Sequence, residues 1–494
     1  MKLTPADYAA LLLILVVALY VGIVNGHYTY DDAFITYRMA ENLATGLGFV
    51  YNANEWHLGS TAAFYGLILA GLAWIFGGAA IPAIGGVMSA LSVLATGWIL
   101  YGLGRGMQRA DATLCGLLAA LFYVANPMIF VTFGGEMPFL LALITGAFFA
   151  YQRHARLTAT LLAVAAMLTR PDGVQAAMVL LTWDIVSRRR VPWRELVVGA
   201  IVLLPFVALA WHAYGSPLPS TLGAKLAQRD SGLWPTFVRG LVDWIRLFVW
   251  NDRGPNLGFA PVAPPTLWFW MIAGVLGIWR YRAFWPVLAY VGVFVLGYAA
   301  LRVPFYHWYA APAALGLSIL AGCGLAAVAD LIVTVWKSGD RRAVHGGAIA
   351  LALLISAPAL AALPRTSALN DTVKLYIQAG HWLDAETPPS RSVGYYEIGY
   401  IGFYGHRRMI DALGLIDPSV SPAVARRDFA WAFGKARPDY ILEKRGAGLN
   451  AFLNEPWFKE EYRPLATLSL RPGAPEALIV HERRTSPTPS PGRR

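Results

Sequence analysis

Long apolar stretches alternate with short polar ones along most of the chain. About eleven of these stretches approach the roughly 17–25 residues that a membrane-spanning helix needs, and none has a charged residue at its centre. They cover residues 8–24, 80–103, 112–130, 137–151, 156–169, 173–187, 195–213, 266–279, 283–301, 309–336 and 343–363. Three of them are short (137–151, 156–169 and 173–187), so we expect their helices to extend into polar flanks. The pattern predicts an all-α polytopic membrane bundle.

Basic loops set the predicted orientation. They lie near residues 105–109, 153–156, 188–194, 280–282 and 337–342. Consecutive basic loops are separated by two apolar runs, so they share one side of the membrane. The positive-inside rule assigns that side to the cytoplasm.

A further apolar run, 61–77, decides where the first polar loop lies. If this run crossed the membrane, residues 25–60 would face the cytoplasm, yet they hold one arginine and no lysine. We therefore interpret 61–77 as a re-entrant or interfacial helix, with the N-terminus in the cytoplasm and the C-terminus outside. The outer side then gathers Asp31–Asp32, Gly134–Glu136, Arg170–Gly173, Tyr214–Lys225 and Tyr306–Tyr309.

The long outer loop, 214–265, contains a predicted amphipathic helix. Its apolar residues recur at helical spacing, at Trp234, Phe237, Val238, Leu241, Trp244, Ile245 and Phe248, with Arg239, Asp243 and Arg246 opposite. Such a helix lies in the membrane interface, and it also suits a cover over the bundle. In either role this helix does not cross the membrane.

Composition shifts after the last apolar run, at Pro364, to that of a soluble segment. A helix is expected over 372–384, with strand-like runs at 391–396, 439–442 and 477–481. The predicted domains are a transmembrane domain, 1–363, with outer loops 25–79 and 214–265, and a small extracytoplasmic α/β domain, 364–484. The Pro-, Ser- and Arg-rich tail, 485–494, is expected to be disordered.

Composition supports a membrane protein. Hydrophobic residues make up 57% of the 494 residues and charged residues only 14%, far below the charge of a soluble globular chain. The net charge of +11 comes from short clusters between apolar runs, so it sets topology and gives no sign of a nucleic-acid partner. Cys115 and Cys323 lie inside apolar runs and are expected to be small core residues.

Two adjacent carboxylates, Asp31 and Asp32, follow the first apolar run within a few residues. Near a low-dielectric boundary each loses hydration and repels the other, so such a pair more often serves chemistry or a bound cation than stability. Helix capping is the alternative, with Asp32 capping a helix that carries Phe34 and Tyr37 on its apolar face. These residues alone leave both interpretations open.

Several motifs carry a family resemblance. The first loop contains Asp31-Asp32, Arg38, Asn42-Leu43, Gly46-x-Gly48 and Tyr51-Asn52. Further pieces are Pro127 to Glu136, Leu168-Thr169-Arg170-Pro171-Asp172-Gly173, Tyr214-Gly-x-Pro-x-Pro-Ser-x-x-x-x-Lys225 and Ile410-Asp411-x-x-Gly-Leu415. Together they resemble the GT-C superfamily of membrane glycosyltransferases, which use polyprenyl-phosphate-linked sugars. The likeness covers nearly the whole chain and is strongest to bacterial members with an Asp-Asp pair, such as the mycobacterial terminal arabinofuranosyltransferases.

The resemblance implies a multi-pass enzyme of the bacterial cytoplasmic membrane with its active site on the outer face. It implies inverting transfer of a pentose such as arabinofuranose, or of a hexose, from a polyprenyl-phosphate donor to a cell-envelope glycan, lipid or protein acceptor. Asp31, the first acidic residue of the loop, would be the general base, and Asp32 would orient the acceptor or help hold a cation. A positioned carboxylate supplies about 10²–10⁴ in rate, and a like-charged neighbour raises its pKa toward useful basicity.

The acceptor side departs from the family pattern. Residues 53–59 stand where relatives tend to have Gly-Glu-x-Val-x-Gly, so the identity of the acceptor does not carry over. Glu55 and His57 are the candidate acceptor-side residues in this loop.

Six residues are candidates for binding the donor or its phosphate: Arg38, Glu136, Arg170, Lys225, His307 and Tyr309. An outward-facing cation near the bilayer surface suits a lipid phosphate. Lys225 is the first choice, because it follows a proline-rich turn in a loop able to close over a lipid. The structural alternatives are a first-turn glutamate at position 136, an Arg170–Asp172 pair and an interfacial hydrogen-bonded His307.

No cofactor is certain from the sequence. Asp31, Asp32 and Glu136 could hold Mg²⁺, Mn²⁺ or Ca²⁺, although no spacing demands a metal. The rival functions are a lipid-linked sugar transporter or flippase, which would need ionisable groups or broken helices at mid-membrane, and a non-catalytic envelope assembly protein.

Overall fold

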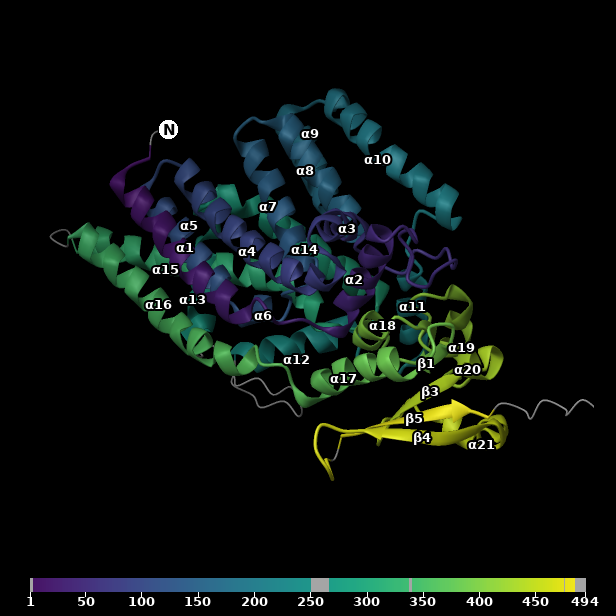
Figure 1. Cartoon of the computed structure of the whole chain (residues 1–494). Coiled ribbons are helices and arrows are strands. Elements are labelled where there is room, and N and C mark those ends of the chain that lie inside the picture. The colour runs from purple at the N-terminus through teal and green to yellow at the C-terminus, as the bar shows by residue number, and fades with distance from the viewer. Residues whose placement is uncertain (1–2, 250–265, 337–339, 475, 485–494) are drawn as a thin grey trace, which may run out of the picture. The chain divides into compact units, whose positions relative to one another are not determined.

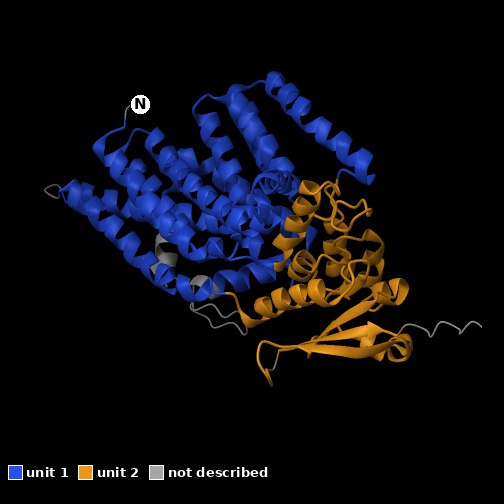
Figure 2. Cartoon of the chain, viewed as in Figure 1, with its two compact units in different colours: residues 1–30, 61–217, 235–368 blue, residues 31–60, 218–234, 369–494 orange. Residues whose placement is uncertain are grey.

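The structure is a computed structural model that describes residues 3–249, 266–336, 340–474 and 476–484. The chain forms two compact units (Figure 2), each built from segments far apart in the sequence. Unit 1 comprises Met1–Tyr30, Thr61–Pro217 and Pro235–Ala368, and unit 2 comprises Asp31–Ser60, Leu218–Trp234 and Leu369–Arg494. The predicted tail, 485–494, and residues 250–265 of the predicted outer loop lie outside the described residues.

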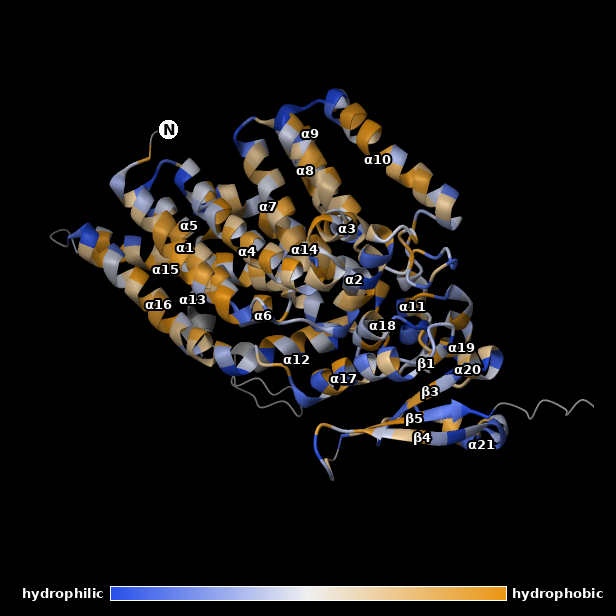
Figure 3. Cartoon of the chain, viewed as in Figure 1, coloured by the Kyte–Doolittle hydropathy of each residue, from blue (hydrophilic) through white to orange (hydrophobic). Residues whose placement is uncertain are grey.

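Unit 1 is helical. Its α-helices are α1 (Pro5–Asn25), α3 (Ala63–Phe76), α4 (Ile81–Gly106), α5 (Ala110–Val124), α6 (Pro127–Phe130), α7 (Met137–Gln152), α8 (Arg156–Thr169), α9 (Val174–Arg188), α10 (Trp193–Tyr214), α12 (Phe237–Val249), α13 (Thr266–Gly277), α14 (Trp285–Leu301), α15 (Ala311–Val335) and α16 (Arg341–Thr366) (Figure 1). Short 3₁₀ turns are η1 (Gly78–Ala80), η2 (Pro171–Gly173), η3 (Ile278–Arg280), η4 (Arg282–Phe284) and η5 (His307–Ala310). Figure 3 shows that apolar residues dominate these helices and that polar residues gather at their ends.

The described part of the chain contains six helical segments long and apolar enough to cross a membrane. They are Pro5–Asn25, Gly78–Gly106, Trp193–Tyr214, Arg282–Leu301, His307–Val335 and Arg341–Glu386, and five shorter apolar helices accompany them. The expectation of a polytopic membrane protein is therefore confirmed. The count of about eleven spans, the re-entrant role of 61–77 (now α3) and the orientation stay predictions.

One predicted span, 112–130, is divided in the structure. Helix α5 ends at Val124, and the separate helix α6 begins at Pro127, where the ring nitrogen has no N–H to continue a helix. Asn126 caps α6 by accepting a hydrogen bond from the backbone N–H of Met128 at 2.9 Å. The proline and the cap end the longer helix that hydrophobicity alone suggested.

The core of unit 1 includes the contact between α5 and α15. The two helices approach so closely that a Cβ on Gly322 would lie 2.4 Å from the backbone nitrogen of Ala119. Cys115 and Cys323 meet there as buried free thiols, with their Sγ atoms 2.7 Å apart. Both cysteines are core residues, as predicted.

The amphipathic segment of the long loop forms helix α12. Phe237, Leu241 and Trp244 are buried, as expected for one apolar face. Val238 was expected on that face but is half exposed, and Trp234 precedes the helix and belongs to unit 2. The buried face is therefore narrower than the sequence pattern indicated.

Unit 2 combines helices with a five-stranded sheet. Its helices are α2 (Asp31–Ala44), α11 (Thr221–Ser231), α17 (Asp371–Glu386), α18 (Gly399–Gly405), α19 (Ser421–Ala425), α20 (Trp431–Ala436) and α21 (Pro456–Glu461), with 3₁₀ turns η6 (Pro418–Val420) and η7 (Ala451–Asn454). Its strands are β1 (Ser392–Tyr395), β2 (Arg408–Asp411), β3 (Tyr440–Lys444), β4 (Tyr462–Leu468) and β5 (Leu478–Arg483). The strand order is β2-β1-β3-β5-β4, with β2, β1 and β3 parallel and β5 antiparallel to both β3 and β4.

The predicted helix 372–384 and the three strand-like runs correspond to α17, β1, β3 and β5. Two strands, β2 and β4, were not predicted. Strand β4 lies at the sheet edge and contains Pro464 beside a register shift, the position where a strand tolerates proline. Unit 2 also contains residues 31–60 and 218–234 together with the C-terminal segment. This division differs from the predicted one into a transmembrane domain, 1–363, and a C-terminal domain, 364–484.

Candidate functional site

In unit 2, helix α2 begins at the Asp31–Asp32 pair. Phe34, one turn along, packs its ring against Tyr400 and Phe403 of α18, with centroids 4.2 and 5.2 Å apart. This aromatic contact sets α2 against the segment that follows β1. The pair is thereby held beside a part of the chain more than 360 residues away in sequence.

The Asp31 carboxylate is fixed by two backbone donors. The N–H of Gly399 donates to Oδ2 and the N–H of Tyr400 donates to Oδ1, both at 2.9 Å. Only glycine allows this approach, because a Cβ on residue 399 would lie 1.8 Å from the Asp31 carbonyl oxygen. Asp31 is therefore held by α18 and not by the first turn of its own helix.

Electrostatics make Asp31 unusual for an aspartate. Burial raises its pKa to about 8, and the nearby Glu397 and Asp32 carboxylates act in the same direction. The hydrogen bonds from Tyr400 and Gly399 oppose the rise in pKa, but only in part. The result is a positioned carboxyl group that accepts a proton near neutral pH.

Asp32 is one-third exposed and forms an ion pair with Lys225, with Oδ2 and Nζ 3.7 Å apart. The sequence pattern predicts Lys225 in a loop able to close over a lipid, whereas the structure places it in a helix. The residue lies in helix α11, which begins just after the proline-rich turn, and its side chain is 10% exposed. The predicted base, its neighbour and the predicted donor-binding lysine thus all belong to unit 2.

Glu397 was missed by the sequence analysis. It follows β1, where the carboxyl ends of parallel strands present polar groups at one sheet edge. Burial raises its pKa, while a hydrogen bond from Tyr376 and the charge of Lys444 lower it. The available signal was a lone carboxylate, in Tyr396-Glu397-Ile398-Gly399, directly after a predicted strand.

Arg38 has a structural use in this arrangement. Its guanidinium is buried and donates to the carbonyls of Gly402 and Arg407 at 2.7 and 2.6 Å. It also stacks over the Tyr51 ring at 4.5 Å, and Tyr51 donates to the carbonyl of Ile398 at 2.5 Å. These contacts join α2 to α18, and a role of Arg38 in donor binding stays a prediction.

The remaining first-loop motif shapes the turn after α2. Asn42 donates to the carbonyls of residues 50 and 51, and Gly46 and Gly48 have φ near +90°, a conformation that favours glycine. Asn52 exchanges two hydrogen bonds with the backbone of Met409, so the turn is attached to β2. The motif thus builds the support of the Asp pair.

Of the acceptor-side candidates, Glu55 forms an ion pair with Arg408 at 2.6 Å and accepts a hydrogen bond from Asn52. His57 is half-buried in the same loop. Both residues lie in unit 2, and their roles stay predictions.

Two other motif residues also stabilise unit 2. Asp411 accepts the N–H groups of Leu413 and Ile416 at 2.7 and 3.0 Å, and burial raises its pKa to about 6. Ser220 donates to the carbonyls of Leu58 and Leu415 at 3.2 and 2.7 Å. Ser220 therefore ties together three segments distant in sequence.

A second ionic cluster lies in unit 1. Arg170 forms ion pairs with Asp172, at 3.1 Å, and with Glu136, the residue directly before α7. Tyr298 donates to Asp172 at 2.6 Å. Burial opposes the charge on Arg170, but Asp172, Tyr298 and Glu136 outweigh it and raise the pKa of the guanidinium well above its usual value. The expected Arg170–Asp172 pair is present, and Glu136 joins it.

His307 and Tyr309 both lie in η5, and Tyr309 is close to this cluster. The Tyr309 ring lies 5.7 Å from the Arg170 guanidinium. His307 meets Tyr30 and Trp308 edge-to-face, with centroids 5.1 and 4.9 Å apart. Both are parts of an aromatic cluster in unit 1, and their contact with a donor stays a prediction.

Metal binding gains no support from the described ranges. Among those residues, no group of three or more His, Cys, Asp or Glu side chains is placed to hold an ion. Glu136 belongs to unit 1 and is paired with Arg170, whereas Asp31 and Asp32 belong to unit 2.

Sequence comparison identifies only the C-terminal segment. Residues 367–486 match a family described as a domain of unknown function (DUF8728). No match to the chain was found among curated proteins. This matched segment contributes Glu397, Gly399 and Tyr400 to the surroundings of Asp31.

Solved structures resemble the chain over most of its length. ArnT from Cupriavidus metallidurans in the apo state has a TM-score of 0.60 at 15% identity, covering 96% of this chain and 98% of ArnT. The same protein bound to undecaprenyl phosphate gives 0.59 at 15% identity, over 97% and 98%. The apo oligosaccharyltransferase of Archaeoglobus fulgidus gives 0.52 at 14% identity, over 88% of this chain and 69% of that protein. The chain therefore shares its fold with these proteins.

Proposed function

We propose that the chain is an inverting glycosyltransferase that moves a sugar from a polyprenyl-phosphate donor to an acceptor hydroxyl, with Asp31 as general base. The observation that carries the proposal is the Asp31 carboxylate, oriented by two N–H donors and surrounded so that its pKa is about 8. A sugar hydroxyl is a weak nucleophile. A fixed carboxylate with a pKa near neutral can take its proton as the oxygen attacks.

Three observations support this assignment. The first-loop motif resembles the GT-C superfamily, to which the two structural neighbours also belong. One of those neighbours was solved with undecaprenyl phosphate bound. The six long apolar helical segments among the described residues suit a lipid-linked donor. From these observations we infer that the donor is a polyprenyl-phosphate sugar.

The chemistry follows from the groups in unit 2. As the acceptor oxygen attacks the anomeric carbon, its proton passes to Asp31 and the bond to the phosphate oxygen breaks. Negative charge grows on the departing polyprenyl phosphate, and Lys225 is the candidate cation to stabilise it. The transferred sugar is a pentose such as arabinofuranose, or a hexose, and the acceptor is a cell-envelope glycan, lipid or protein. The reaction is assigned to the outer face of the bacterial cytoplasmic membrane.

The experiment compares Asp31→Asn with wild type, using purified protein and a panel of radiolabelled polyprenyl-phosphate pentoses and hexoses with cell-envelope acceptors. The substitution removes the proton acceptor with little change in volume, so transfer should fall by about 10²-fold or more. Asp371→Asn, which changes an exposed carboxylate in the first turn of α17, is the matched control and should transfer normally. Near-normal transfer by a folded Asp31→Asn protein would return Asp31 to a structural role and favour an assembly protein.

A further inference from the structure

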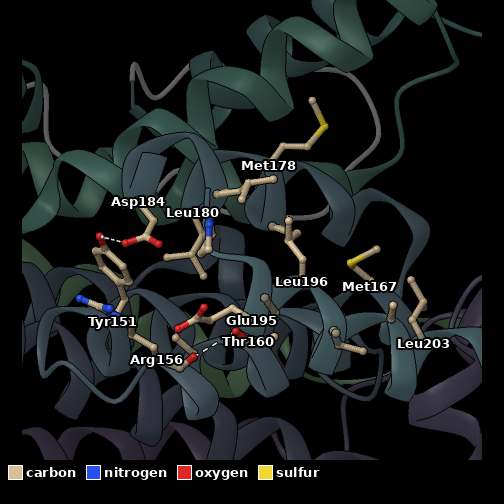
Figure 4. A pocket seen from close by; sticks show the side chains of 18 of the residues that line it. Tyr151, Arg156, Thr160, Met167, Met178, Leu180, Asp184, Glu195, Leu196 and Leu203 are labelled. Atoms are coloured by element: carbon tan, nitrogen blue, oxygen red, sulfur yellow. Dashed lines mark hydrogen bonds between the residues drawn. The ribbon is translucent and has the colours of Figure 1, made fainter. Parts of the chain in front are cut away.

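A cavity of about 360 Å³ lies in unit 1 between α8, α9 and α10 (Figure 4). Its size falls at the lower end of ligand pockets, which span roughly 300–1,000 Å³. Its walls are mostly aliphatic, and none of the candidate residues of the two ionic clusters lines it. The cavity is therefore a separate feature of the molecule.

Helix α10 explains why the space is open. Over its 22 residues, Trp193–Tyr214, no side chain is buried, although the helix runs beside α8. Small residues face the cavity from both helices, among them Ala159 and Ala163 of α8 and Gly199 of α10. The gap between them is long and apolar, so in a bilayer a hydrocarbon chain would occupy it in preference to water.

One end of the cavity is polar. Figure 4 shows Tyr151, Arg156 and Asp184 together at this end, with Met167 and Leu203 at the other. The Tyr151 hydroxyl donates to Asp184 at 2.7 Å, and Arg188 pairs with the second Asp184 oxygen at 3.3 Å. The Asp184 carboxylate therefore already has partners within the protein for both of its oxygens.

Arg156 is the group available to a ligand at this end. It is half-buried and lines the cavity, and no carboxylate of the described residues forms an ion pair with it. Glu195 also lines the cavity and carries the opposite charge. Six arginines, at positions 153, 156, 188, 189, 190 and 194, occur in the segments that border this end, against two carboxylates, Asp184 and Glu195. The excess of positive charge favours an anionic headgroup.

We propose that the groove between α8, α9 and α10 holds an acyl chain of an anionic phospholipid, whose phosphate contacts Arg156. The apolar length accommodates the chain, and the arginine-rich end selects a net-negative headgroup over a zwitterionic one. The positive-inside pattern predicts that this end faces the cytoplasmic leaflet, away from the outer face assigned to the reaction. The lipid would stabilise the otherwise unburied α10 against α8.

The test measures lipid retention and does not depend on transfer activity. The delipidated full-length protein in neutral detergent is titrated with phosphatidylglycerol or with phosphatidylcholine, and the bound lipid is counted by native mass spectrometry. Phosphatidylglycerol should bind at least about fivefold more tightly. Arg156→Gln should weaken it about tenfold, the size of one charge-assisted contact, while Arg342→Gln, at an exposed arginine of α16, should leave it unchanged.

A second variant fills the groove. A Cβ on Gly199 would meet only Thr160 Cγ2 at 3.5 Å and Val164 Cγ2 at 3.6 Å, which are ordinary contacts, so Gly199→Leu should fold and exclude the chain. Its control is Gly346→Leu, at an exposed helical glycine with open space around it. Equal binding of the two phospholipids, or binding unchanged by both groove variants, would overturn the proposal. Displacement of phosphatidylglycerol by equimolar undecaprenyl phosphate in a Gly199-dependent manner would instead assign the groove to the donor chain.

Discussion

The two ionic clusters of this protein are built in opposite ways. In unit 1, the cation Arg170 is surrounded by acceptors from Glu136, Asp172 and Tyr298. In unit 2, three carboxylates, those of Asp31, Asp32 and Glu397, interact with one another, while Lys225 pairs with Asp32 and the charge of Lys444 acts on Glu397. The same residue types therefore give a closed ion pair in one unit and an excess of negative charge in the other.

The Asp31 cluster is the one expected to react. A cation whose donors are satisfied has little capacity left for a ligand, and removing it leaves buried carboxylates without compensation. A carboxyl group with a raised pKa gains a proton readily and loses it to solvent near neutral pH, which suits acid–base chemistry. We therefore expect the Arg170 cluster to contribute stability and the Asp31 cluster to take part in the proposed chemistry.

The largest effect is expected in unit 1. Arg170→Met would leave Glu136 and Asp172 buried beside each other, so the free energy of unfolding should fall by roughly 3–5 kcal/mol. Thermal melting in detergent measures the loss, and Arg239→Met, at an 80% exposed side chain of α12, is the control. An unchanged melting curve combined with lost transfer would contradict a stabilising role for Arg170 and would make it the phosphate ligand.

The support of Asp31 gives the next effect. Gly399→Ala would place a Cβ 1.8 Å from the Asp31 carbonyl oxygen, so the two N–H donors must move away from the carboxylate. Displacement of a catalytic group by about 1 Å costs on the order of 10²-fold in rate, and kcat should report it. Gly448→Ala, in open space in the same domain, should be silent. Full activity of the Gly399 variant would show that α18 does not position the base.

A smaller effect is expected at Lys225. Lys225→Met should lower transfer about tenfold, because a charge near the departing phosphate is lost. Lys225→Arg should restore part of it, since the charge remains in a different geometry. Lys374→Met, at an exposed lysine paired with Asp371, controls for loss of a surface charge. Equal rates for the methionine variant and wild type at subsaturating donor would assign the phosphate contact elsewhere.

The smallest effect concerns pH. With the Asp31 pKa at about 8, the deprotonated base is a minor form at pH 7, so kcat/KM should rise about fivefold from pH 7 to pH 8. Glu397→Gln removes a neighbouring negative charge, which should lower the pKa of Asp31 and shift the rise to lower pH. If Glu397→Gln leaves the pH profile unchanged, Glu397 does not influence the pKa of Asp31.

The sequence predicted the elements that depend on local pattern. Hydrophobic runs located most unit 1 helices, and alternation and turn residues located α17, β1, β3 and β5. The prediction of one continuous helix over 112–130 was wrong, because Pro127 interrupts an apolar run that hydropathy alone would treat as continuous. The sequence also singled out Asp31 and Arg170 as candidate site residues, because charged residues beside apolar runs are conspicuous, and their roles stay predictions.

Tertiary structure decided how these residues are used. Asp31, Lys225 and Glu397 are separated by more than 150 residues along the chain, and no local pattern records that they belong to one compact unit. Arg38 and Asn52 carried the resemblance in sequence, yet the fold uses them to attach α2 to α18 and β2. Sequence periodicity fixes which faces are apolar, whereas the raised pKa of Asp31 arises from burial and from charges that only the folded chain brings near.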